Sequence, residues 1–188
     1  MNGQPATQAG TRQAPRWTTR LEDHGPAVPP AAAAWLTEPG LLTERLRACC
    51  SGHTGLTVIA ETEAQLAAPD AAVLRAPGSA VFVREIELTC DGRAWVFAQT
   101  LVPQATLSRH RWLSSLGRAA LGERLAAVPG LERGPLEFAR LVAGDRLYHR
   151  ALRERADPPA SLWARRSWFA IAGDRLLVQE VFLPESHA

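Results

Sequence analysis

The clearest pattern along the chain is a pair of β-rich runs on either side of Asp91–Gly92. AVFVREIELTC (80–90) precedes this dipeptide and RAWVFAQTLV (93–102) follows it. Asp-Gly between two such runs is the strongest short-range signal of a β-hairpin, because its tight turn needs residues that tolerate positive φ. A second hairpin is predicted by the runs around Gly173–Asp174, namely SLWARRSWFAIA (161–172) and RLLVQEVFLP (175–184).

Helices are predicted in two parts of the chain. AAAAWLTE (31–38) follows a pair of prolines, and LLTERLRACC (41–50) follows the break at Pro39–Gly40. Residues 105–128 have a helical pattern that is interrupted at Gly117. These segments alternate with the hairpins and show no internal repeat.

Two shorter runs, LTVIAETE (56–63) and PLEFARLV (135–142), predict further strands. Residues 64–79 contain two prolines and a glycine and are predicted to form a loop. The whole pattern predicts an α+β fold with mainly antiparallel strands and helices set against the sheet.

The composition places the chain among ordinary globular proteins. Of 188 residues, 46% are apolar and 21% charged, and the net charge is +2. So balanced a charge does not favour a nucleic-acid or membrane surface, and no apolar run is long enough to span a bilayer. Residues 1–16 are small and polar and predict a disordered tail, which leaves 17–188 as a single domain. No secretory signal pattern is present, so we expect a cytoplasmic protein.

Several chemistries lack the residues that they need. The 21 basic residues are all arginine, which excludes Schiff-base, pyridoxal-phosphate and phosphate-loop lysines. The five histidines are scattered, and we expect neither a metal nor a cofactor. No G-x-S-x-G or G-x-G-x-x-G motif is present. The three cysteines, Cys49, Cys50 and Cys90, predict no disulfide framework and fit a reducing compartment, with the adjacent pair packed inside.

Two charged residues occupy apolar rows of the predicted hairpins. Side chains two apart on a strand share a face, so Arg84 lies among Phe82, Ile86, Leu88 and Cys90. The opposite face of this strand looks solvated and carries Val83, Glu85, Glu87 and Thr89. If Cys90 pairs with Arg93, Arg84 faces Gln99, with Trp95, Phe97 and Leu101 on the same side.

Glu180 lies in the last strand, in a row with Leu176, Val178 and Phe182. Pairing across Gly173–Asp174 places it near Ser167 and diagonal to Arg165. One interpretation is a structural ion pair of Glu180 with Arg165 or with Arg84. The other is that Arg84 holds a ligand carboxylate while Glu180 serves the far end of the ligand. Neither hairpin strand offers Arg84 an acid on its own face, which favours a ligand.

At these residues the chain resembles the chorismate lyase family. The resemblance covers residues 35–184 and is carried by these segments: WLTEPGLLTERL (35–46), VREIELTCDGRAWVFAQTLVP (83–103), LSSLGRAALGERL (113–125), LWARRSWFAIAG (162–173) and LLVQEVFLP (176–184). It implies a single antiparallel sheet whose helical flaps close over a buried ligand cavity. It also implies cofactor-free cleavage of chorismate to 4-hydroxybenzoate and pyruvate, the first step toward ubiquinone, by a cytoplasmic protein that we expect to be a monomer.

The resemblance also assigns site residues. The carboxylate-binding arginine of the family matches Arg84, and its glutamate at the far end of the ring matches Glu180. Two backbone amides that complete the carboxylate pocket match Leu121 and Leu42. Leucine at 42 replaces a usual methionine, which is tolerable because only the backbone is used. Gln99 replaces an arginine of a familiar member, so that position carries no assigned role.

A second hypothesis is a catalytically inactive or regulatory domain that senses small aromatic ligands. The effector domains of GntR-type transcription regulators have a similar fold. They normally follow a winged-helix domain, whereas here only about 30 residues without a helix-turn-helix pattern precede the first helix.

Overall fold

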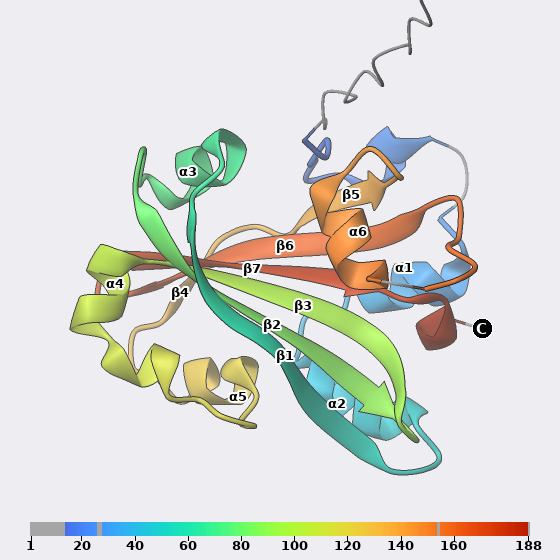
Figure 1. Cartoon of the computed structure of the whole chain (residues 1–188). Helices are drawn as coiled ribbons and strands as arrows, with labels where there is room; N and C mark the ends of the chain where they lie inside the picture. Colours follow the sequence, from blue (N-terminus) through green and yellow to red (C-terminus); the bar gives the residue numbers. More distant parts are fainter. Residues whose placement is uncertain (1–13, 26–27, 154, 188) are drawn as a thin grey trace, which may run out of the picture.

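The computed structural model describes residues 14–25, 28–153 and 155–187, and these form one antiparallel sheet with helices on both faces (Figure 1). The sheet order is β1-β2-β3-β7-β6-β4, and β5 also pairs with β6. The predicted α+β class is confirmed. The strands are β1 (Thr54–Gln65), β2 (Ala80–Cys90), β3 (Arg93–Pro103), β4 (Glu132–Arg133), β5 (Glu137–Leu141), β6 (Leu162–Ile171) and β7 (Asp174–Phe182).

The helices divide between the two faces of the sheet. The face that carries Arg84 is covered by α1 (Pro30–Leu36), α2 (Leu42–Cys49) and α5 (Leu121–Ala126). The opposite face is covered by α3 (Ala68–Leu74) and α6 (Arg146–Leu152), and Figure 1 shows α6 in front of the sheet with α1 and α2 behind it. The remaining helical segments are η1 (Leu21–His24), α4 (Gln104–Arg109), η2 (Arg111–Ser114) and η3 (Pro184–His187).

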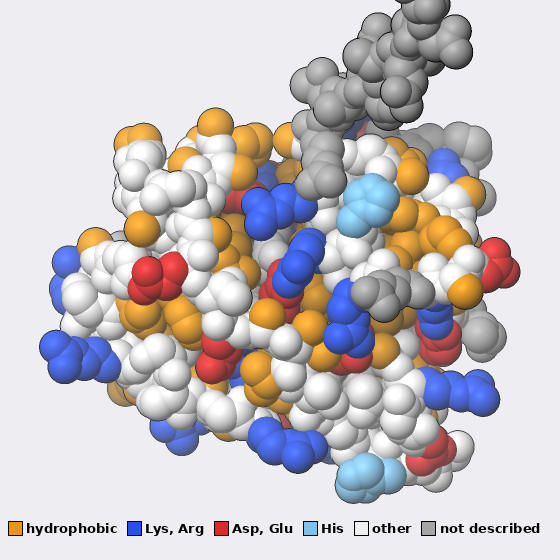
Figure 2. Space-filling model, in the orientation of Figure 1, with side chains coloured by type: hydrophobic (Ala, Val, Ile, Leu, Met, Phe, Trp, Pro, Cys, Tyr) orange, Lys and Arg blue, Asp and Glu red, His pale blue; other side chains and the backbone are white. Residues whose placement is uncertain are grey.

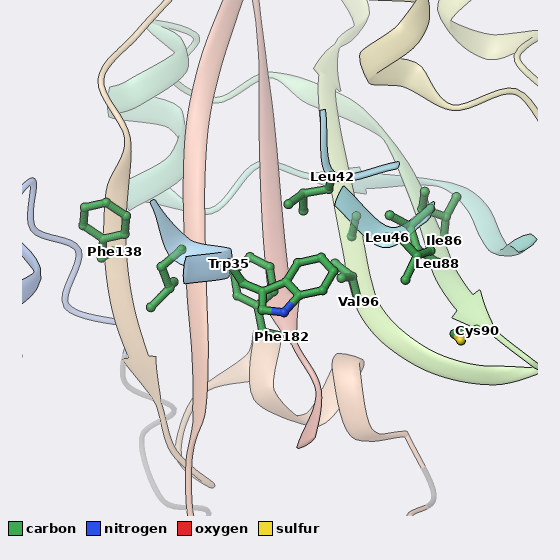
Figure 3. Close-up of a cluster of buried hydrophobic side chains, with 11 residues drawn as sticks. Trp35, Leu42, Leu46, Ile86, Leu88, Cys90, Val96, Phe138 and Phe182 are labelled. Atoms are coloured by element: carbon green, nitrogen blue, oxygen red, sulfur yellow. The ribbon is translucent and has the colours of Figure 1, made fainter. Parts of the chain in front are cut away.

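The core on the Arg84 side is built where α1 and α2 meet the central strands. Trp35 lies over Phe182, with ring centroids 6.0 Å apart, and Leu42 and Leu46 face the β2 side chains Ile86 and Leu88 (Figure 3). Burial of these large side chains stabilises the fold by about 1.5–3 kcal/mol each. It also fixes the start of α2 over the sheet.

The first hairpin has the predicted turn but a different register. Cys90 pairs with Arg93 as expected, yet the register shifts by one residue after Leu88, so Arg84 faces Thr100 rather than Gln99. A bulge of one residue moves every later side chain of its strand to the other face. Trp95 packs in the core on the Arg84 side, whereas Phe97 and Leu101 belong to clusters on the opposite face.

The β2 face predicted to be solvated is buried instead. Glu85 is 1% exposed and Glu87 9% exposed, because α6 covers them. Arg150 pairs with Glu85, and Arg153 Nη2 lies 2.7 Å from Glu87 Oε1. Figure 2 shows the corresponding mixture of basic and acidic side chains over the face with α6. Helix α6 and the residue that follows it thus supply the counterions of Glu85 and Glu87, which neither hairpin contains.

Two further expectations need correction or lie outside the described residues. Residues 64–79 contain the helix α3, which begins close to Pro69 and buries Leu74. Proline is tolerated there because the first helical turn needs no N–H from it. Of the predicted tail, residues 1–13 lie outside the described residues. No described helix has both the length and the apolar character needed to cross a membrane.

The cysteines also differ from the prediction. Cys50, just after α2, forms a disulfide with Cys90 at the end of β2, and Cys49 is an exposed free thiol. Among the described residues, the only cluster of possible metal ligands is Cys50, Cys90 and Asp91, whose two sulfurs are joined in this disulfide. The bond attaches the end of α2 to the tip of the first hairpin.

Candidate active site

A cavity of about 320 Å³ lies between the sheet and two helical segments. Its floor comes from β2, β3, β6 and β7, and its cover from the start of α2 and from α5. It brings together all four predicted site residues, Arg84, Glu180, Leu121 and Leu42. Most of its wall is apolar, as in small-molecule sites. The apolar wall residues include Ile86, Leu88, Ala98, Leu125, Leu131, Phe169 and Val178.

Arg84 is one of two buried arginines that line this cavity. Its side chain is 1% exposed, and Nη2 donates to the carbonyls of Gly117 at 2.7 Å and Ala119 at 3.3 Å. Its Nε donates to Glu61 Oε1 at 3.2 Å. Burial lowers the pKa of Arg84, and Glu61 acts in the opposite direction. Arginine stays charged under such shifts, so the cavity holds a permanent cation.

Sequence reasoning missed Glu61 because it considered only the two hairpin strands. Glu61 lies on β1, directly opposite Arg84 in the register of β1 with β2. Its side chain is 34% exposed, so it balances Arg84 from the solvent side of the site. The strand predicted at residues 56–63 was the available signal, but its pairing with β2 could not be predicted from that run alone.

Glu180 lies on β7 opposite Arg165 of β6. The turn falls on Ala172–Gly173, one residue earlier than predicted, and this places Arg165 rather than Ser167 across from Glu180. Arg165 Nε donates to Glu180 Oε2 at 2.6 Å. Of the two ion pairs considered from the sequence, Arg165–Glu180 is present, and Arg84 pairs with Glu61 instead.

Arg165 joins Glu180 to the cover of the cavity. It is 2% exposed, and its Nη1 donates to the carbonyls of Trp35 at 3.2 Å, Leu36 at 3.3 Å and Glu38 at 2.7 Å. These carbonyls lie at the end of α1, just before the segment that covers the cavity. Through Nε and Nη1 the guanidinium therefore links the carboxylate of Glu180 to the backbone around the end of α1.

A third arginine, Arg133 on β4, lines the same cavity and was missed from the sequence. It donates from Nη1 to the carbonyl of Pro39 at 3.0 Å and lies 5.4 Å from the Phe169 ring centroid. Burial of its inner side and the charge of Arg165 lower its pKa, while Glu180 raises it. A strand of two residues gives too little pattern to predict such a placement.

The cover of the cavity consists of two flaps, which we define as residues 39–49 and 104–126. Leu42 and Leu121 are the first residues of α2 and α5, where backbone N–H groups have no partner within the helix. Gly117, where the predicted helical pattern is interrupted, has a φ of 53°. The flaps are joined by Arg47 Nη2 and Glu123 Oε1, 2.7 Å apart.

Gln99 takes no part in this cavity. It lies on the opposite face of the sheet and donates from Nε2 to Glu85 Oε1 at 2.7 Å.

The arrangement of the cavity as a whole offers one buried cation for an anion, backbone donors beside it, and a carboxylate held by a second cation. Such a site suits a small ligand with a carboxylate at one end and a polar oxygen at the other.

Comparison with known proteins agrees with this chemistry. Residues 17–187 match the model of a family described as chorismate lyase. A probable chorismate pyruvate-lyase from Dechloromonas aromatica is 39% identical over 170 residues, covering 90% of this chain and 94% of that protein. One from Aromatoleum aromaticum is 41% identical over 164 residues, covering 85% and 88%.

Among solved structures, the ligand-binding domain of a putative GntR-family regulator from Bordetella bronchiseptica has a TM-score of 0.51. It is 13% identical and covers 71% of this chain and 85% of that one, so the likeness shows the fold alone and does not favour a regulatory role. The identities of 39% and 41% to the curated relatives are far higher than the 13% to this regulator domain. Together with the family match over residues 17–187, they show that the chain belongs to the chorismate lyase family.

Proposed function

We propose that the protein cleaves chorismate to 4-hydroxybenzoate and pyruvate in the cavity between the flaps and the sheet. The observation that carries this proposal is the placement of Arg84 and Glu180 on one face of the sheet, both lining an apolar cavity. Their strands, β2 and β7, are separated by β3. Two strand spacings are about 10 Å. A ring with a carboxylate at one end and an oxygen at the other fits between two side chains that extend into such a gap.

In this proposal Arg84 binds the ring carboxylate of chorismate. The amides of Leu121 and Leu42 complete the carboxylate pocket from the two flaps. On binding, the substrate carboxylate takes donors of Arg84 that the Gly117 and Ala119 carbonyls and Glu61 hold in this structure. Charge-assisted bonds of this kind are about twice as strong as neutral ones, which favours the exchange.

The reaction is an elimination that makes the ring aromatic. The C4–H and C3–O bonds break, a C3–C4 double bond forms, and the ether oxygen leaves with the electron pair as enolpyruvate. Protonation of the enolpyruvate gives pyruvate. Because aromatisation is strongly downhill, the protein mainly needs to hold a reactive pose and stabilise the developing charge.

Glu180 is the group proposed to act at the C4 end of the ring. Arg165 occupies Oε2, and within the described residues no hydrogen bond to Oε1 is formed, so that oxygen is free to meet the C4 hydroxyl or accept the C4 proton. The same proposal includes turnover without a cofactor and a cytoplasmic location. It also includes a role at the first step toward ubiquinone and a monomeric single domain over residues 17–188.

The test is direct incubation of the purified protein with chorismate, without added metals or cofactors. We expect 4-hydroxybenzoate and pyruvate to accumulate in equal amounts, measured by chromatography and by a coupled pyruvate assay. Chorismate that disappears no faster than in a protein-free control would refute the proposed activity. Tight binding of 4-hydroxybenzoate without turnover would instead indicate a domain that only senses its ligand.

A further inference from the structure

Three arginines line the cavity, and one of them has no carboxylate partner. Arg84 pairs with Glu61, and Arg165 pairs with Glu180. Arg133 makes no ion pair with a carboxylate in the part of the chain that the structure describes, and the bond that it donates goes to the Pro39 carbonyl. Its positive charge is therefore not balanced by a contacting side chain.

Arg133 lies near Glu180 rather than beside Arg84. It is opposite Phe169 of β6, the strand that also carries Arg165, and it interacts electrostatically with both Arg165 and Glu180. One side of Arg133 lines the cavity while the other stays exposed to solvent. A charge in this position can serve a ligand group at the Glu180 end of the cavity.

Chorismate has a second carboxylate in a position that fits. Its enolpyruvyl ether is attached at C3, next to the C4 that carries the hydroxyl. With the ring carboxylate at Arg84 and C4 at Glu180, the ether and its carboxylate lie beside Glu180. We propose, resting on the proposed function, that Arg133 binds the enolpyruvyl carboxylate of chorismate and so distinguishes substrate from product.

This role places Arg133 at the leaving group. As the C3–O bond breaks, the electron pair moves to the ether oxygen, and a guanidinium already on the same enolpyruvyl group lies close to the new charge. Arg165 already uses Nε on Glu180 and Nη1 on the carbonyls around the end of α1, whereas Arg133 contacts no carboxylate among the described residues. The product 4-hydroxybenzoate lacks the second carboxylate and has no group for Arg133 to bind.

The test compares substrate with product in charge variants of Arg133. Arg133→Gln keeps a donor for the Pro39 carbonyl but removes the charge, and we expect kcat/KM for chorismate to fall about 10- to 100-fold. The dissociation constant of 4-hydroxybenzoate should change less than about twofold, because the product never uses this charge. Arg133→Lys should recover part of the loss, and Arg93→Met, at the exposed tip of the first hairpin, should have no effect.

Two results would overturn the inference. Equal losses for chorismate and 4-hydroxybenzoate would mean that Arg133 only holds the flap through Pro39, and unchanged kinetics in both variants would mean that the charge is not used. Because the wild-type protein is assayed in parallel, absence of 4-hydroxybenzoate from that sample would refute the proposed function instead. Thermal melting of each variant identifies any that fails to fold, and Arg133→Lys then carries the test.

Discussion

Arg165 Nε donates to Glu180 Oε2 at 2.6 Å, and Nη1 of the same guanidinium donates to the Glu38 carbonyl at 2.7 Å. One buried side chain therefore fixes both the carboxylate at the far end of the cavity and the backbone that leads into the first flap. We interpret Arg165 as a positioning residue, because it decides which oxygen of Glu180 faces a ligand.

Arg165→Lys keeps the charge but loses the fork of donors, so it should leave Glu180 less well oriented. We expect kcat to fall about 10- to 100-fold while KM changes much less, on the scale of a lost charge-assisted hydrogen bond. Steady-state kinetics with chorismate measure this split. A rise in KM with normal kcat would show instead that Arg165 acts only through the flap.

Glu180→Gln should lower kcat by about 10²- to 10⁴-fold, the usual contribution of a general acid or base. Glutamine keeps the shape and can still accept a bond from Arg165, so the melting temperature should stay close to that of the wild type. Kinetics and thermal melting together separate the possible roles. Full activity in this variant would leave Glu180 with an orienting role only.

Arg84→Lys should reduce kcat/KM by about 30- to 1,000-fold, because lysine cannot form the two parallel bonds to a carboxylate. The matched variant is Glu61→Gln, which removes the competing partner of Arg84 on the solvent side. We expect that variant to bind 4-hydroxybenzoate more tightly, as measured by calorimetry. Near-normal kcat/KM in Arg84→Lys would make Arg84 a structural residue.

The hairpins and the two inward charges could be predicted because alternation and Asp-Gly turns are local signals. The register could not, since no local pattern marks the bulge after Leu88. The bulge leaves Trp95 packed against Trp35 of a distant helix, with ring centroids 6.1 Å apart. Shifts of one residue then moved Gln99 off the Arg84 face and brought Arg165 opposite Glu180.

Other features depended on contacts between distant segments. Glu85 looked solvated because its counterion, Arg150, lies 65 residues further along the chain. Glu61 and Arg133 reach the cavity through strand pairings that no local pattern specifies. The family resemblance supplied the roles of Leu42 and Leu121, which as apolar residues carry no chemical signal of their own.

The ion pair of Arg47 with Glu123 predicts a pH dependence of flap closure. The hydrogen bond from Arg47 lowers the pKa of Glu123 below its ordinary value of 4.5. A carboxyl whose pKa falls on closure stabilises the closed flaps above its ordinary pKa, and this contribution is lost as the pH drops through the lowered value. Both side chains are largely exposed, so the effect is small.

Glu123→Gln should therefore weaken 4-hydroxybenzoate binding by about 1.5- to 5-fold near neutral pH, on the scale of an exposed ion pair. The ratio of variant to wild-type affinity should approach one in acid, where Glu123 is protonated in both flap states. Taking this ratio cancels the titration of the ligand itself. A ratio that stays constant from neutral to acid pH would contradict the role of this ion pair.

The disulfide between Cys50 and Cys90 joins the end of the first flap to the sheet across 40 residues. Closing a loop of this length stabilises a fold by about 4 kcal/mol in the chain-entropy model, equivalent to roughly 8–16 °C in melting temperature for a domain of this size. We expect a reductant or Cys90→Ser to lower the melting temperature by up to this amount. Cys49→Ser, which removes the adjacent exposed thiol, should leave the melting temperature unchanged.

Thiol titration of the denatured protein tests the same disulfide independently. We expect one reactive thiol without reductant, from Cys49, and three after reduction. Three thiols before reduction would show that the purified protein lacks the bond, and the first flap would then be held to the hairpin by packing alone.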